Sequence, residues 1–95
     1  MPAYLIAMVE VTDPQKYQEY AKGAGVAMQE YGGKFLARGG SSEVLEGKPP
    51  GTRFVVAEFA NAEAAKKYYH SPEYQAARQH RLGAAHFNMV VVEGA

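Results

Sequence analysis

Cysteine and tryptophan are absent from this sequence of 95 residues, and neither sign of charge is in excess. The lack of cysteine excludes disulfides, thiolate nucleophiles and zinc–thiolate sites. Because ten basic residues balance ten acidic ones, no long-range field draws the protein toward nucleic acid or a membrane surface. We therefore expect neither nucleic acid nor a membrane as a partner.

Long hydrophobic runs and targeting signals are missing as well. The first apolar stretch, residues 4–11, is short and has no basic segment before it, which fits neither a signal peptide nor a membrane span. We expect a cytoplasmic protein. The length predicts one domain, 1–95, and a chain of this size buries only about 60 to 65% of its unfolded surface, so a partner chain would add stability.

The first half of the chain predicts a strand, a helix and a second strand. Residues 4–11 are mostly apolar and rich in strand formers. Asp13 before Pro14 starts the helix, because aspartate caps and proline suits the first helical position. Apolar residues then recur at helical spacing until the glycine pair 32–33 stops the helix. Residues 34–38 follow as a short strand.

The second half predicts two more strands and a broken helix, in which Ser71 before Pro72 repeats the cap-then-proline pattern. The expected elements are a strand extension at 43–46, a loop at 47–51, a strand at 53–59, a helix at 62–69, a helical piece from 72 to 81 and a strand at 87–93.

Gly23 and Gly25 lie inside the first predicted helix, where each costs roughly 1 kcal/mol relative to alanine. We therefore expect a close contact or a kink near them. The same segment lacks the third glycine of a dinucleotide-binding motif and follows no strand, so it does not support a nucleotide site.

The order β-α-β-β-α-β predicts an α+β protein with the ferredoxin-like fold, in which the helices cover one face of a four-stranded antiparallel sheet. Alternation along each strand assigns one set of side chains to the helix-covered face: Leu5, Ala7, Val9, Phe35, Ala37, Val55, Ala57, Phe59, Val90 and Val92. It assigns a second set to the bare face: Tyr4, Ile6, Met8, Glu10, Lys34, Leu36, Arg38, Phe54, Val56, Glu58, Phe87, Met89 and Val91.

This bare face is too apolar for solvent, and pairing it with a second copy would remove roughly 600 Å² from water. That burial contributes about 15 kcal/mol gross, against an association cost of roughly 4 to 15 kcal/mol. We expect a homodimer on this basis. The charged residues Glu10, Lys34, Arg38 and Glu58 would then lie near a shared cavity, where charges must pair or meet a ligand.

Five stretches of the sequence also resemble a known family. They are Met1-Pro2-Ala3-Tyr4, Asp13-Pro14 with Tyr17 and Tyr20, Tyr31-Gly32-Gly33 through Arg38-Gly39-Gly40, Ser71-Pro72-Glu73-Tyr74-Gln75, and Val91-Val92-Glu93-Gly94. Together they resemble the family known as domain of unknown function 1330, in the dimeric α/β-barrel superfamily. The resemblance implies a ferredoxin-like protomer and a homodimer but no agreed activity. Relatives in the superfamily include cofactor-free monooxygenases, isomerases and haem enzymes.

Two charged residues are the first candidates for chemistry. Arg38 ends the second strand between glycines and could bind a carboxylate or an enolate oxygen, or form a salt bridge across the dimer to Glu58 or Glu10. Glu58 lies among apolar residues and could act as a base, or pair with Lys34 on the neighbouring strand.

The three histidines match no metal-binding spacing, and we expect no metal and no cofactor. His80 and His86 could reach the mouth of a barrel as acid, base or haem ligand, but surface or capping roles are more common for such residues. Tyr4, Phe54 and Tyr68 are the candidate ligand contacts beside Arg38. Tyr17, Tyr20 and Tyr31 of the first helix are expected to pack in the core.

The leading hypothesis is a homodimer that binds a small apolar or aromatic organic acid in a cavity between the sheet and the helices, with Arg38 as its anchor. One alternative is a cofactor-free monooxygenase-type or isomerase enzyme that uses Arg38 with Glu58, His80 or His86. Another is a purely structural or interaction dimer.

Overall fold

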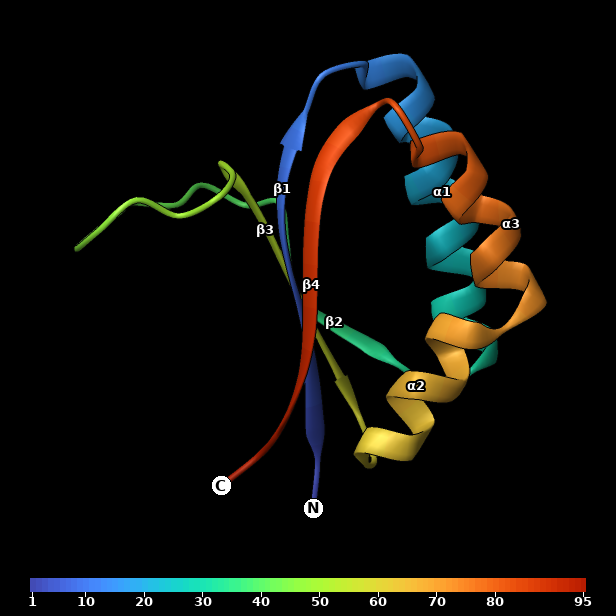
Figure 1. Ribbon diagram of the computed structural model, residues 1–95. Coiled ribbons are helices and arrows are strands. Elements are labelled where there is room, and N and C mark those ends of the chain that lie inside the picture. Colours follow the sequence, from blue (N-terminus) through green and yellow to red (C-terminus); the bar gives the residue numbers. More distant parts are fainter.

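The structure, a computed structural model, describes residues 1–95. Its elements are β1 (Ala3–Val11), α1 (Pro14–Glu30), β2 (Lys34–Arg38), β3 (Arg53–Phe59), α2 (Ala62–His70), α3 (Pro72–Arg81) and β4 (Ala85–Glu93). The strands form one antiparallel sheet in the order β2-β3-β1-β4. All three helices cover the same face of that sheet (Figure 1). The predicted ferredoxin-like arrangement is therefore confirmed.

Side-chain caps begin each helix where the sequence predicts. The side chain of Asp13 accepts a hydrogen bond from the Lys16 amide, and Asn61 does the same for Ala64. Ser71 separates α2 from α3, because its hydroxyl donates to the Tyr68 carbonyl at 2.7 Å and accepts from the next helix. None of the helices has the length and apolar character needed to cross a membrane.

Two glycines end α1, and each is required for a different structural reason. Gly32 has φ of 77°, in the left-handed region that side chains avoid. Gly33 follows and donates its amide to the Met28 carbonyl at 2.9 Å, which closes the helix end. A side chain at position 33 would overlap Met28 and Phe59, so this glycine also lets the chain turn tightly against the core.

Helices α1 and α3 pack closely at Gly23, where an added Cβ would lie 2.9 Å from the Cβ of Ala77. At Gly25 an added Cβ would lie 3.0 Å from the Arg38 guanidinium. The predicted close contacts near these glycines are confirmed. Space for a neighbouring helix and for an arginine side chain explains why neither position carries alanine.

The segment between β2 and β3 contains no strand, so the predicted extension at 43–46 is wrong. Residues 40–50, here called the arm, project from the sheet on the side opposite the helices (Figure 1). Val44 and Leu45 near its middle are 55% and 90% exposed. A lone segment without a neighbouring strand cannot satisfy the backbone hydrogen bonds that a strand needs.

The predicted faces of β4 are also wrong. Phe87, Met89 and Val91 lie opposite buried β1 residues and pack against the core under the helices. Val90 and Val92 instead lie on the bare face, with 50% and 47% of their surface exposed. The run of apolar residues in this strand gives no alternation, so only its register with β1 decides which side faces the helices.

The predicted face of Arg38 is wrong because β2 contains a bulge. Phe35 pairs with Ala57, Ala37 pairs with Val56, and the register shifts between them. One extra residue in a strand moves every later side chain to the opposite face. Ala37 consequently takes a bare-face position, and Arg38 faces the helices.

Candidate functional site

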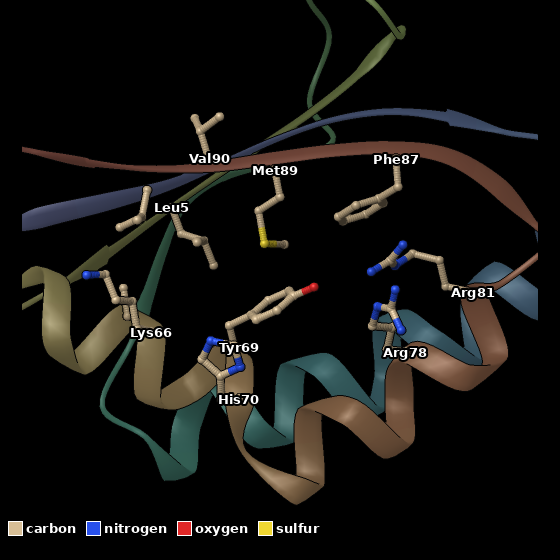
Figure 2. Close-up of a pocket in the computed structure, with 11 residues that line it drawn as sticks. Leu5, Lys66, Tyr69, His70, Arg78, Arg81, Phe87, Met89 and Val90 are labelled. Atoms are coloured by element: carbon tan, nitrogen blue, oxygen red, sulfur yellow. The ribbon is translucent and has the colours of Figure 1, made fainter.

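A cavity of about 310 Å³ lies between the β4 edge of the sheet and helices α2 and α3. Figure 2 shows that most of the side chains around it point inward, whereas Val90 points away. The cavity has eleven lining residues: Leu5, Ala65, Lys66, Tyr69, His70, Arg78, Arg81, Phe87, Met89, Val90 and Val91. Seven of the eleven are hydrophobic, and none is a carboxylate.

The sheet supplies the apolar wall of this cavity. Phe87 and Met89 project from β4 toward the helices, beside Leu5 of β1 (Figure 2). The ring of Tyr69, from α2, lies across from them, and its hydroxyl points toward the end of the cavity where the arginines lie (Figure 2). The space therefore suits an apolar group of modest size with a polar group at one end.

Arg81 is buried at that end, with only 7% of its surface exposed. The guanidinium carbon lies 3.7 Å from the centroid of the Phe87 ring and 5.1 Å from that of Tyr20. One terminal nitrogen donates to the Tyr74 hydroxyl at 3.4 Å. The Nε atom is buried and has no hydrogen-bond partner. The aromatic rings stabilise the charge, but a donor remains unsatisfied.

Arg78 lies one helical turn before Arg81 and reaches the same end of the cavity (Figure 2). Its Nε is also buried without a partner. Neither arginine forms a salt bridge, since the single ion pair of the structure joins Lys66 to Glu63 at 3.8 Å. Two guanidinium groups thus share an apolar cavity with no protein counter-ion, which favours binding of an anion.

Buried tyrosines pack around Tyr74, the hydrogen-bond partner of Arg81. The hydroxyls of Tyr20 and Tyr74 are hydrogen bonded at 2.9 Å, and Tyr74 is fully buried. The Tyr68 hydroxyl donates to the Ala24 carbonyl at 3.2 Å. Burial raises the pKa of Tyr20 and of Tyr68 well above the usual value of 10.0. Both hydroxyls therefore stay protonated to a higher pH than the hydroxyl of an exposed tyrosine.

We expect these two tyrosines to make the protein less stable in alkali. At a pH below 10.0, the ordinary tyrosine pKa, folded and unfolded states are equally protonated. Above it the unfolded chain releases protons that the folded chain keeps, so the free energy of unfolding falls as pH rises. Urea denaturation from about pH 8 to 11 should show this fall, and Tyr68→Phe should make it shallower. A flat profile in the wild type would contradict the burial argument.

The predicted site residues do not meet at one place. Arg38 and Tyr68 line a second, smaller cavity on the helix side of the sheet. Tyr4, Phe54 and Glu58 belong to the bare face, where Tyr4 and Glu58 are paired positions of β1 and β3. Arg38 and Glu58, which the enzyme hypothesis combines, therefore lie on opposite faces of the sheet.

The remaining predictions concern two exposed histidines and the half-buried Glu58. His80 and His86 are both exposed, and neither lines the cavity of about 310 Å³. Glu58 lies opposite Lys34 in the sheet, but the two form no salt bridge. The histidine that does line the cavity is His70, at the end of α2.

Arg78 and Arg81 were not among the predicted site residues, although the sequence carries a signal for Arg81. It follows Tyr74 by seven positions and Ala77 by four, which places it on the buried stripe of α3. A charged residue on the apolar face of a helix needs a partner or a ligand. The spacing alone could have identified it.

Comparisons with known proteins agree with this fold. The family model described as Domain of unknown function (DUF1330) matches residues 2–95. Among curated proteins, none matches this sequence. Among solved structures, the RPA0582 protein of unknown function from Rhodopseudomonas palustris is 19% identical over 99% of this chain and 82% of its own, with a TM-score of 0.78.

Two further structures are similar in fold. A protein from Jannaschia sp. CCS1, described as dimeric, ferredoxin-like and of unknown function, is 16% identical over 99% of this chain and all of its own, with a TM-score of 0.68. SnoaB from Streptomyces nogalater, described as a cofactor-independent oxygenase, is 9% identical over 99% of this chain and 93% of its own, with a TM-score of 0.66. At these identities the likeness extends to the fold alone.

Proposed function

We propose that this chain, which belongs to the DUF1330 family, binds a small apolar or aromatic organic acid in the cavity between the sheet and the helices. The observation that carries the proposal is Arg81. Arg81 is 7% exposed as a residue, its Nε has no hydrogen-bond partner, and its guanidinium group has no carboxylate partner. This arrangement supports a ligand that brings the missing anion.

The free energy of Arg81 is less favourable in the empty cavity than with a carboxylate bound. Burying a charge without a partner costs free energy, and leaving a donor unsatisfied costs about 1 to 3 kcal/mol more. A carboxylate can accept two hydrogen bonds from one guanidinium group, and such charge-assisted pairs are stronger than neutral ones. Arg81 therefore gains more from a carboxylate than from a neutral ligand of the same shape.

The size and lining of the cavity limit the rest of the ligand. Its volume of about 310 Å³ is at the lower end of the range of about 300 to 1,000 Å³ common for small-molecule sites. Leu5, Phe87 and Met89 offer apolar contacts, and Lys66 and His70 at the other end are exposed. One aromatic ring or a short branched chain beside the carboxylate would fit these contacts.

Calorimetry with a matched pair of ligands tests this proposal. Phenylacetate and phenylacetamide have nearly the same shape, but only the first carries a charge. We expect the acid to bind at least tenfold more tightly, because it alone forms charge-assisted hydrogen bonds. Equal affinity for both, or no binding of any acid from a panel of aromatic and branched carboxylates, would overturn the proposal.

We also propose that the protein is a homodimer whose bare sheet faces pack together. The centre of this face is apolar, with Ile6 of β1 paired to Val56 on one side and Val90 on the other. The arm projects on the same side and exposes Val44 and Leu45, which supports contact with a second copy (Figure 1). The description of the Jannaschia protein as dimeric supports it further.

No particular observation favours an enzyme over a binding protein. The fold is shared with a cofactor-independent oxygenase at 9% identity, but fold likeness carries no activity. The residues expected to act with Arg38 are Glu58, on the opposite face, and the exposed His80 and His86. Binding is therefore the function that the site supports best.

A further inference from the structure

Arg38 and Arg53 both line a second cavity, of about 40 Å³, on the helix side of the sheet. Its thirteen lining residues come from α1, the four strands and α2: Ala7, Tyr17, Tyr20, Ala21, Ala24, Met28, Phe35, Arg38, Arg53, Val55, Tyr68, Phe87 and Met89. The two arginines are the only charged residues among them. Neither forms a salt bridge.

Arg53 is held in place by its surroundings. Its guanidinium carbon lies 5.5 Å from the centroid of the Tyr17 ring. Gly39 packs directly against it, since any side chain at position 39 would overlap the guanidinium group. The Nε atom of Arg53 is buried and has no hydrogen-bond partner. A fixed donor in an apolar setting without an acceptor is suited to an anionic ligand.

Arg38 approaches the same cavity from the other side. One of its terminal nitrogens donates to the Ala21 carbonyl at 3.0 Å, and the guanidinium carbon lies 4.2 Å above the Phe35 ring. Gly25 leaves room for it on α1. Arg38 also lines a surface groove together with Lys22, so the cavity has a cationic approach from solvent.

We propose that this cavity is a second anion site, in which Arg38 and Arg53 bind a planar oxyanion of carboxylate size. Arg38 is exposed and Arg53 is half-buried, and an anion between them would reduce the repulsion between their like charges. The cavity holds about 40 Å³, which by the usual measure is room for two or three water molecules. A carboxylate fits this space, and an aromatic ring does not.

The second site is separate from the proposed organic-acid site but adjoins it. Phe87 and Met89 line both cavities, so the two cavities are neighbours. Two sources of the oxyanion follow from this geometry. It is either a free ion such as formate, entering beside Arg38, or the far carboxylate of a long ligand whose other end reaches Arg81.

Nitrogen-15 NMR of the arginine Nε–H groups in the whole protein tests the site, once substitution of each arginine in turn has assigned the Arg53 and Arg81 signals. In a formate titration at constant ionic strength, we expect the Arg53 signal to shift and to saturate. Arg38→Gln, followed on the Arg53 signal, should weaken this binding at least tenfold. Lys34→Gln removes the same charge from the bare face and should leave the binding unchanged.

A second pair of ligands distinguishes the two sources. If octanedioate shifts the Arg53 and Arg81 signals together while octanoate shifts only Arg81, the oxyanion is the far end of a long ligand. If formate alone moves Arg53, it is a free ion. If none of these ligands moves the Arg53 signal, or if Lys34→Gln weakens binding as much as Arg38→Gln does, the second site is overturned. The Arg81 signal would then still test the organic-acid site separately.

Discussion

Replacing Arg81 by methionine is expected to weaken the binding of phenylacetate by about 10- to 100-fold without lowering the stability of the ligand-free protein. A charge-assisted hydrogen bond contributes about 1.5 to 3 kcal/mol, which corresponds to that loss of affinity. Methionine keeps the flexible apolar stem of the side chain, so contact with the Phe87 ring is retained.

The stability of the same variant separates a binding role from a structural one. Arg81 loses its hydration on burial and gains aromatic contacts and one long hydrogen bond in return. Since replacing a buried charge by a well-packed apolar group is often neutral or stabilising, we expect the midpoint of urea denaturation to stay or to rise. An arginine kept only for structure would give a large loss of stability.

Lys67→Met is the matched control, because Lys67 is an exposed residue of α2 that does not line the cavity. It removes one positive charge, so it should reproduce any effect of net charge alone. If Arg81→Met binds phenylacetate as tightly as Lys67→Met does, Arg81 is not the anchor. If Arg81→Met lowers the midpoint of urea denaturation sharply while its folded form binds phenylacetate as tightly as Lys67→Met does, Arg81 has a structural role.

Replacing Ile6 by lysine is expected to convert the homodimer into monomers. Ile6 lies at the centre of the bare face between two valines, and the proposed symmetric contact would bring the two new charges close to each other. Burying an unpaired charge costs several kcal/mol, so the dissociation constant should rise by roughly 100-fold or more. Light scattering should show a fall from twice the 10.3 kDa chain mass to that mass itself.

The control for this variant is Val26→Lys, which makes the same kind of change on the solvent side of α1. Val26 is 57% exposed and belongs to the helix layer. The Val26→Lys variant should remain dimeric, and both variants should keep the circular dichroism spectrum of the wild type. A wild-type protein that is monomeric at micromolar concentration, or an Ile6→Lys variant that stays dimeric, would contradict the proposed interface.

The sequence predicted the features of the fold that local chemistry controls. Asp13, Asn61 and Ser71 cap their helices as expected, because each cap side chain and the backbone amide that donates to it lie within three residues of each other. The glycine stop after α1 is similarly local. These signals fixed the order of elements, and the order of elements is sufficient for the ferredoxin-like arrangement.

Features that depend on strand pairing were predicted poorly. The bulge between Phe35 and Ala37 turns Arg38 to the helix side, and nothing in the alternation of five residues reveals it. The apolar run in β4 is equally compatible with either face until its register with β1 is known. Both errors changed the predicted site, since they moved Arg38, Phe87 and Met89 to the helix side of the sheet.

The cavity between the sheet and the helices was predicted, but the residues that line it were not. A cavity between the sheet and the helices was expected, and the structure has one, but its arginines are Arg78 and Arg81 in place of Arg38. The helical spacing of Arg81 was readable from the sequence. The absence of a carboxylate around it was not, because that requires knowing every neighbour in space.

The most direct test of this account is a crystal structure of the protein with phenylacetate bound. We expect a carboxylate oxygen of phenylacetate at about 3 Å from the Nε of Arg81, with the phenyl ring of the ligand against Phe87 and Met89. A ligand bound only on the bare face of the sheet, or one whose ring rather than its carboxylate contacts Arg81, would contradict it.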